Sequence, residues 1–184
     1  MSPEEQTLAL ANEVADTLAA RGAKSAVIGA IAVAIHGYPR STQDVDLATT
    51  TDLAILREVA SELQTRGCIV RLGEPDHEDP LGGVLTVVRG DADPVQVVNY
   101  ANPFFPGSGA LAKEAIESAV QKLGPLAVVD LSHLIALKLY AGGAKSKLDV
   151  VELLARNATA DRGAIANVCA RHGLQTEWDE LQRM

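Results

Sequence analysis

The sequence predicts an α/β (α+β) protein in which helices flank a mixed β-sheet and the C-terminal third is helical. Three observations lead to this class. Helical and β-rich segments alternate through the first half of the 184-residue chain, three β-rich runs follow one another in the middle, and helical periodicity dominates the C-terminal third. A chain of this length can bury a sizeable core within one domain.

The first five elements carry clear end signals. Residues 2–22 open with a serine, a proline and two acids and stop at a glycine, which predicts a helix. "SAVIG" (25–29) is a short buried strand, and the small residues of 30–37 form a helix up to a glycine. "TQDVDLATT" (42–50) alternates between turn signals, as a strand does. Residues 51–67 form a helix with a threonine or aspartate cap and a glycine stop.

Three β-rich runs follow, "CIVRL" (68–72), "GGVLTVVRG" (82–90) and "PVQVVNY" (94–100). The acidic, proline-flanked "GEPDHEDPLGG" between the first two is a loop, and a surface loop is the simpler interpretation of its Asp, Glu and His residues than a metal site. "SGALAKEAIESAVQKLG" (108–124) has the composition and spacing of a further helix.

The remaining chain turns from a short extended segment, "LAVV" (126–129), to helices. The expected helices cover residues 130–142, 145–156, 161–173 and 176–184. We therefore expect a core over residues 1–125 and a helical C-terminal part over residues 126–184 that packs on the core. The boundary is soft, and the two parts can also form one domain.

Composition excludes several classes of protein. The net charge of −8 argues against an extended DNA-binding surface, because such a surface needs many cations to neutralise phosphates. Cys68 and Cys169 are far apart and have no metal-ligand spacing, which is typical of buried thiols in a reducing compartment. The acidic N-terminus and the lack of a membrane-length apolar run predict a cytoplasmic protein with no membrane association.

Two carboxylates stand on the predicted strand at 42–50. Asp44 and Asp46 are two residues apart, so their side chains share one face of the strand at a separation of roughly 6–7 Å. Convergent carboxylates repel each other unless a cation lies between them, and Mg²⁺ binds one or two carboxylates together with phosphate oxygens. The pair therefore predicts a magnesium site, although such a pair can also be a solvated strand edge.

Residues upstream of the pair suit a phosphate-bearing ligand. Gly29 precedes a helix, where the missing side chain allows a phosphate to approach backbone N–H groups. Arg40 and Ser41 lie in the turn that leads to the acids. A glycine alone could simply form a tight turn. The whole string of strand, glycine, short helix, His-Gly, Arg, Thr and DxDL is what favours a functional site.

The stretch "VIGAIAVAIHGYPRSTQDVDLATT" resembles the signature of the nucleotidyltransferase superfamily, which has a polymerase-β-like fold, in its AbiEii-type toxin-like branch. The later stretch "DLSHLIALKLYAGGAKSKLDVVELL" is similar to the helices of the same branch. The two stretches cover roughly a third of the chain and occur in the expected order. The resemblance implies a minimal nucleotidyltransferase core that uses an NTP substrate and Mg²⁺.

By position, the resemblance implies a role for several residues. Asp44 and Asp46 would bind metal, Gly29 would border the triphosphate, and Arg40 would hold phosphate or orient the acids. Lys138 would reach the nucleotide phosphates, although by itself a lysine in "LIALKLYA" indicates a side chain that extends from a half-buried helix to water. Lys147 and Asp149 match the helix that supports the site.

One position departs from the family pattern. A third carboxylate is expected on a later strand, and "DPVQVVNY" has Gln96 in its place. An amide binds Mg²⁺ poorly and cannot act as a general base. Asp93, or Asp91, could supply the missing acid, although strand geometry directs Asp93 to the opposite face.

These observations leave several functions open. The first is a Mg²⁺-dependent transferase that moves a nucleoside monophosphate to a hydroxyl of RNA or protein, as the toxin of a toxin–antitoxin pair with a cognate antitoxin. The loss of the third carboxylate also suits a catalytically degenerate module that binds nucleotide or protein. The acidic composition suits a third function, transfer to a small cationic antibiotic such as an aminoglycoside.

Overall fold

The structure of the protein is a computed structural model that describes residues 2–42 and 44–183. Its helices are α1 (Pro3–Ala19), α2 (Gly29–Ile35), α3 (Leu53–Thr65), α4 (Ala110–Glu117), α5 (Leu131–Ala141), α6 (Gly143–Arg156), α7 (Arg162–Arg171) and α8 (Gln175–Gln182). Its strands are β1 (Ser25–Val27), β2 (Val45–Thr49), β3 (Ile69–Gly73), β4 (Val84–Val88), β5 (Val95–Asn99), β6 (Val120–Leu123) and β7 (Leu126–Val128). Across residues 2–42 and 44–183, no helix has both the length and the apolar character needed to cross a membrane.

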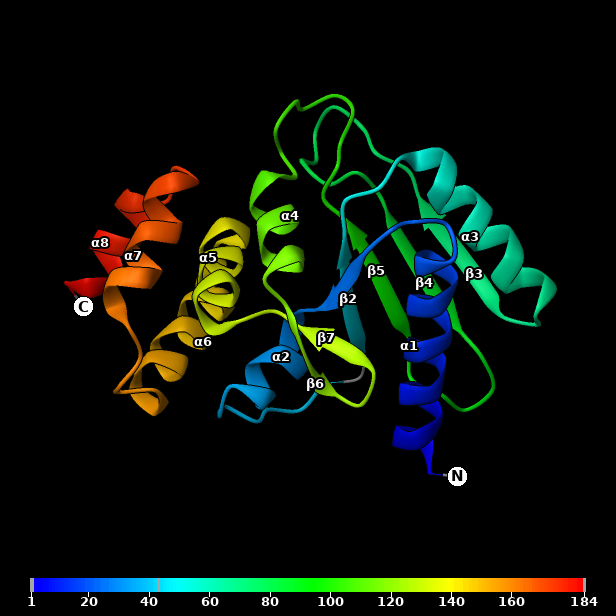
Figure 1. Cartoon of the computed structure of the whole chain (residues 1–184), viewed down its shortest axis with the longest axis horizontal. Helices are drawn as coiled ribbons and strands as arrows, with labels where there is room; N and C mark the ends of the chain where they lie inside the picture. The colour runs from blue at the N-terminus through cyan, green and yellow to red at the C-terminus, as the bar shows by residue number, and fades with distance from the viewer. Residues whose placement is uncertain (1, 43, 184) are drawn as a thin grey trace.

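All of these strands belong to one mixed sheet with the order β3-β4-β5-β2-β1-β7-β6 (Figure 1). β2 lies between β5, to which it is parallel, and β1, to which it is antiparallel. β3, β4 and β5 are antiparallel neighbours, and β7 joins the sheet parallel to β1. This arrangement confirms the predicted class of a mixed sheet flanked by helices, and it places the acid-bearing strand β2 in the middle of the sheet.

One face of the sheet packs against α1 and α3. Leu47, Leu85 and Val97 are adjacent in the strand register and fully buried on this face. In α3 the buried residues Leu56, Val59, Ala60 and Leu63 recur at helical spacing, which is how an amphipathic helix covers a sheet. Because side chains alternate along a strand, Asp46 beside Leu47 lies on the opposite face.

The start of α1 follows the end signals of its sequence. The Ser2 hydroxyl accepts a hydrogen bond from the Glu5 backbone N–H at 3.2 Å, and the Glu5 carboxylate accepts one from the Ser2 backbone N–H at 2.7 Å. This reciprocal capping satisfies two backbone donors that the first helical turn leaves without partners. The helix begins where the serine and proline predict it.

The helix expected over residues 108–124 is wrong in its second half. α4 ends at Glu117, and Val120–Leu123 instead forms β6, which pairs antiparallel with β7. Gly124, with a φ of +57°, turns the chain between the two strands. Pairing with β7 at the edge of the sheet therefore overrides the helical propensity of this segment.

The C-terminal helices gather beyond β7 and β6, on the side away from α3 (Figure 1). His133 joins them to α4, since its Nδ1 lies 2.7 Å from Asp130 Oδ2 and its Nε2 lies 3.3 Å from Glu114 Oε1. Burial lowers the pKa of His133, but the two carboxylates outweigh burial and raise it overall. The predicted boundary after residue 125 falls in the turn between β6 and β7, so the sheet contains strands from both sides of it.

Candidate active site

Asp44 and Asp46, at the start of β2, open into one cavity of about 590 Å³. Asp44 immediately precedes β2, and Asp46 is its second residue. Elements from distant parts of the chain complete the cavity, whose lining residues are Gly29, Ala30, Arg40, Ser41, Thr42, Asp44, Asp46, Lys138, Lys145 and Ser146. The cavity thus brings together most of the residues that the sequence singled out, with carboxylates and cations facing one space.

Gly29 is the first residue of α2 and has a φ of +65°, in the left-handed region that favours glycine. A Cβ atom at this position would lie 1.9 Å from Asp46 Oδ2. The Ile28 backbone N–H also donates to the Asp46 carbonyl at 2.9 Å, which fixes the two chain segments side by side. The glycine therefore makes room for the Asp46 carboxylate itself.

Replacing Gly29 with alanine should displace the Asp46 carboxylate. The left-handed conformation alone costs about 1–2 kcal/mol for a residue with a side chain, and the clash adds to this cost. We expect a lower melting temperature and at least about a tenfold loss of Mg²⁺-dependent nucleotide affinity, the equivalent of about 1.4 kcal/mol. Calorimetric titration and thermal unfolding measure the two effects.

The matched control is Gly124→Ala, because Gly124 also has a positive φ but no atom lies within 4 Å of the position of its Cβ. This variant should lose stability through backbone strain alone and keep its nucleotide affinity. Equal nucleotide affinity in the two variants would contradict the assignment of Gly29 to the site.

A buried carboxylate on α6 joins two cations of the cavity. Asp149 is 1% exposed. Its Oδ2 lies 2.8 Å from Lys138 Nζ and accepts from Arg40 Nη2 at 3.2 Å, and its Oδ1 lies 3.1 Å from Arg40 Nε. Because two cations share one anion, the group carries a net charge of about +1 toward the cavity. α6 therefore holds the phosphate-binding candidates Arg40 and Lys138 in place.

Hydrogen bonds orient Asp44. The Thr42 hydroxyl donates to Asp44 Oδ1 at 2.5 Å, and Gln96 Nε2 donates to Asp44 Oδ2 over a long 3.4 Å. Gln96 lies directly opposite Asp46 in the register of β5 and β2. The amide thus stands beside both carboxylates, at the position where the sequence resemblance implies a third carboxylate.

The environment of Asp46 disfavours its charged form. Burial raises the pKa of Asp46 to about 6, and the negative charge of Asp44 acts in the same direction. Lys138 and Arg40 lower this pKa without cancelling the effect. Two acids that repel each other in a half-buried site would be stabilised by a cation between them.

The donor set fits Mg²⁺ that shares its coordination with a substrate. Within the described ranges, no group of three or more His, Cys, Asp or Glu residues is close enough to hold a metal ion. Two carboxylates suffice for Mg²⁺, since this ion commonly completes an octahedral shell with phosphate oxygens and water. Asp44 and Asp46 are therefore the residues that would hold it.

Some predicted residues lie outside the cavity. Lys147 on α6 is exposed and does not line the cavity. Lys145, two residues earlier, does line it. Asp93 borders a neighbouring cavity of about 480 Å³, which it shares with Asp44 and Arg40. The Asp93 backbone N–H donates to the Thr7 hydroxyl at 2.8 Å, which ties the start of β5 to α1.

Sequence reasoning gave Thr42 only a place in the motif and gave Asp149 only a supporting role. A local signal existed for Asp149, which lies on the buried face of α6 together with Val150 and Leu153. A charge on the apolar face of an amphipathic helix indicates a buried partner. No local pattern indicates which partner that is.

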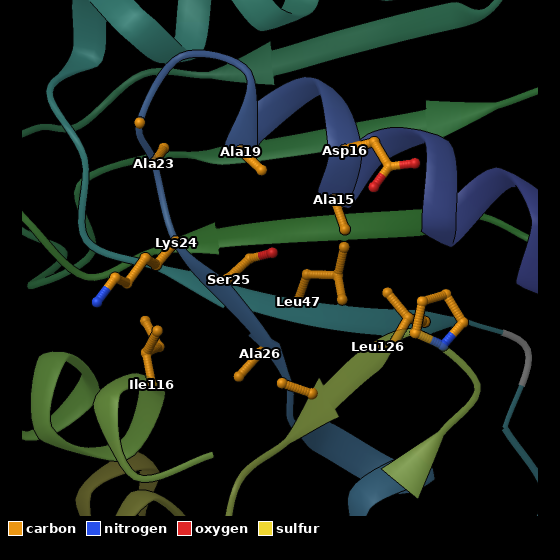
Figure 2. A pocket seen from close by; sticks show the side chains of 13 residues that line it. Ala15, Asp16, Ala19, Ala23, Lys24, Ser25, Ala26, Leu47, Ile116 and Leu126 are labelled. Atoms are coloured by element: carbon orange, nitrogen blue, oxygen red, sulfur yellow. The ribbon is translucent and has the colours of Figure 1, made fainter. Parts of the chain in front are cut away.

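A second cavity, of about 510 Å³, lies between the end of α1 and strands β1 and β7 (Figure 2). Its lining is largely small and apolar, with Ala15, Ala19 and Leu126 labelled in the figure. Leu47, which also lines it, points to the face of the sheet opposite Asp46. This cavity has no paired carboxylates and is separate from the candidate site.

No family model and no curated protein sequence matches the chain. Several solved structures, including the following three, are similar to it in fold. The solution structure of the antibiotic-resistance factor ANT(2'')-Ia has 12% sequence identity and a TM-score of 0.55, over 98% of this chain and 97% of that one. The crystal structure of ANT(2'')-Ia with adenylyl-2''-tobramycin has 15% identity and a TM-score of 0.54, over 91% of this chain and 99% of that one.

The third structure is an antigenic nucleotidyltransferase-like protein from Paracoccidioides brasiliensis, with 13% identity and a TM-score of 0.53, over 97% of this chain and 93% of that one. At these identities the similarity establishes a shared fold. The predicted architecture, a mixed sheet flanked by helices, is shared with these three structures.

Proposed function

We propose that the protein is a Mg²⁺-dependent nucleotidyltransferase that moves a nucleoside monophosphate from an NTP to an acceptor hydroxyl. The observation that carries this proposal is the single cavity into which Asp44, Asp46, Lys138 and the backbone of Gly29 all open. Paired carboxylates beside cations form the arrangement that a metal-bound triphosphate requires. The nucleotidyltransferase-like fold supports the proposal.

The cations of the cavity would bind the triphosphate. Lys138 and Arg40, held by Asp149, and Lys145 from the start of α6 would contact its phosphates, and the Ser41 and Ser146 hydroxyls would donate hydrogen bonds. We assign this role to Lys145 in place of Lys147, because only Lys145 lines the cavity. Gly29 would let a phosphate approach the start of α2.

In the reaction, the acceptor oxygen forms a bond to the α-phosphorus and the bond from this phosphorus to the bridging oxygen breaks. Pyrophosphate leaves, and the hydroxyl proton is released to water. Bound Mg²⁺ would neutralise charge on the phosphates and lower the pKa of the attacking hydroxyl. The residues of the chain hold the reactants in line, which is most of what phosphoryl transfer asks of a protein.

Gln96 favours one alternative, a degenerate protein that binds nucleotide without turnover. It occupies the position opposite Asp46 at which the resemblance implies a third carboxylate. The toxin activity, a cognate antitoxin and an RNA, protein or antibiotic acceptor remain further predictions of the resemblance and the composition.

The proposal is tested with each NTP labelled at the α-phosphate, Mg²⁺, and RNA, protein and small-molecule acceptors. The wild type should transfer label and release pyrophosphate only with Mg²⁺. Gln96→Asp should raise the rate roughly tenfold or more, because a general base contributes about 10²–10⁴-fold in favourable cases. Gln121→Asp, on the exposed strand β6, is the matched control and should leave the rate unchanged.

Three outcomes are distinct. Transfer by the wild type supports the enzyme. Nucleotide binding without transfer, with transfer appearing only in Gln96→Asp, supports the degenerate alternative. A wild type that neither binds Mg²⁺–NTP nor transfers label would overturn the proposal.

A further inference from the structure

A row of polar side chains crosses the sheet and ends at the carboxylate pair. Arg71 on β3 pairs with Thr86 on β4, Thr86 pairs with Gln96 on β5, and Gln96 pairs with Asp46 on β2. Paired residues project to the same face, so all four side chains lie on the face opposite α1 and α3. Three strand spacings place Arg71 about 14 Å from Asp46 along the row.

The outer half of this face is open to solvent. Ile69 is 76% exposed, and Arg71 and Gly73 are exposed as well. Their neighbours Val70 and Leu72 are half-buried and belong to the face that packs on the core. An uncovered sheet surface therefore runs from the edge strand β3 to the active-site cavity.

Arg71 differs from most arginines of the chain. Its guanidinium has no hydrogen bond or ion pair with any residue in the part of the chain that the structure describes. In contrast, Arg40 binds Asp149, and Arg57 binds Glu74. An unpaired guanidinium in the middle of a β-strand, in a protein with a net charge of −8, leaves a strong anion-binding group available.

Apolar residues border the polar row. Ile69 pairs with Val88 on one side, and Val84 pairs with Val98 on the other. A molecule that lies along the row would thus place its polar groups over Thr86 and Gln96 and its apolar surface against valine and isoleucine. The surface suits an extended amphipathic ligand.

We propose that this row binds the acceptor of the transfer reaction, and that the acceptor is an extended, amphipathic carboxylic acid that carries a hydroxyl at its other end. Its hydroxyl would lie at Asp44 and Asp46 and its carboxylate, about 14 Å away, would pair with Arg71. This inference rests on the proposed function and specifies its acceptor. A polyanion such as RNA fits less well, because Arg71 is the one cation among the four residues of the row, and a cationic acceptor would be repelled by it.

The test compares acceptors that differ only in charge. ω-Hydroxydodecanoate, its uncharged methyl ester and the corresponding amino alcohol are each supplied with Mg²⁺ and labelled NTP, and a short RNA is tested in parallel. The wild type should label the carboxylate at least tenfold more efficiently, by kcat/KM, than the ester, the amine or the RNA. Arg71→Ala should remove this preference, and Arg71→Glu should reverse it in favour of the amine.

Binding is measured as well, so that the inference is tested even if the probe reacts slowly. With Mg²⁺–NTP present, ω-hydroxydodecanoate should shift the amide NMR signals of β3, β4 and β5 in the wild type and not in Arg71→Glu. Arg183→Ala, which removes an exposed arginine after α8, at the opposite end of the molecule from β3 (Figure 1), is the matched control and should behave as the wild type does. Thermal unfolding checks that each variant is folded.

The outcomes separate the inference from the proposed function. If the wild type does not bind Mg²⁺–NTP, the proposed function fails first. If it binds Mg²⁺–NTP but the probe shifts no signal in β3 to β5, the inference is overturned. Preferential labelling of RNA or the amine, or an unchanged preference in Arg71→Glu, overturns it too, while transfer itself would stand.

Discussion

Replacing Asp46 with asparagine should reduce nucleotide transfer by about a thousandfold or more, the scale on which removal of a charge-stabilising group affects an active site. An amide has no negative charge for Mg²⁺, and Asp44 alone would hold the metal and the triphosphate more weakly. Asparagine nearly preserves the shape of the side chain, so the fit against Gly29 is kept. Label transfer and Mg²⁺-dependent NTP titration measure the loss.

The same substitution should stabilise the metal-free protein. The pKa of Asp46 is raised from 3.8 to about 6 in the folded state, chiefly by burial. Ionisation of Asp46 therefore costs folding stability as the pH rises from about 4 to 6, and the full cost, on the order of 3 kcal/mol, applies above pH 6. Asp46→Asn should melt higher than the wild type at pH 8 and about equally at pH 4.

Glu117→Gln, which removes an exposed acid from the last residue of α4, is the matched control. It should change neither transfer nor the pH dependence of unfolding. A variant Asp46→Asn that melts lower than the wild type at pH 8, or that keeps its Mg²⁺-dependent transfer, would show that Asp46 is a structural residue and not a metal ligand.

Replacing Asp149 with alanine should cost about 3–5 kcal/mol of unfolding free energy, the usual loss when one partner of a buried ion pair is removed. Arg40 and Lys138 have only 20% and 14% of their side chains exposed, so neither can recover full hydration. For a domain of this size the melting temperature should fall by roughly 10 °C. Triphosphate affinity should fall as well, because both cations lose their fixed positions.

Glu152→Ala provides the control on the same helix. Glu152 is paired with Arg156 at the surface, where such an ion pair contributes only about 0.3–0.5 kcal/mol. Glu152→Ala should therefore keep nearly the melting temperature and NTP affinity of the wild type, whereas Asp149→Ala should lose both. Thermal unfolding and calorimetric NTP titration measure the two quantities. If Asp149→Ala unfolded and bound NTP as Glu152→Ala does, the buried carboxylate would not organise the phosphate side of the cavity.

Features of the site that depend on residues close together in the sequence could be predicted, and features that depend on packing between distant segments could not. Asp44 and Asp46 share a face because a strand repeats every two residues, and this is visible in five residues of sequence. Gly29 was expected to admit a phosphate, whereas its Cβ position also coincides with the Asp46 carboxylate. That second reason requires two segments to be packed, and no local pattern contains it.

The sequence by itself determined the alternation of helices and strands, the capped start of α1 and the side of β2 on which the acids lie. Each of these depends on residues a few positions apart. Only the tertiary structure decided that Val120–Leu123 forms an edge strand, that Lys145 lines the cavity, and that Asp149 joins Arg40 to Lys138. Arg40 and Asp149 are 109 residues apart, and such contacts depend on how whole elements pack, which local propensity does not encode.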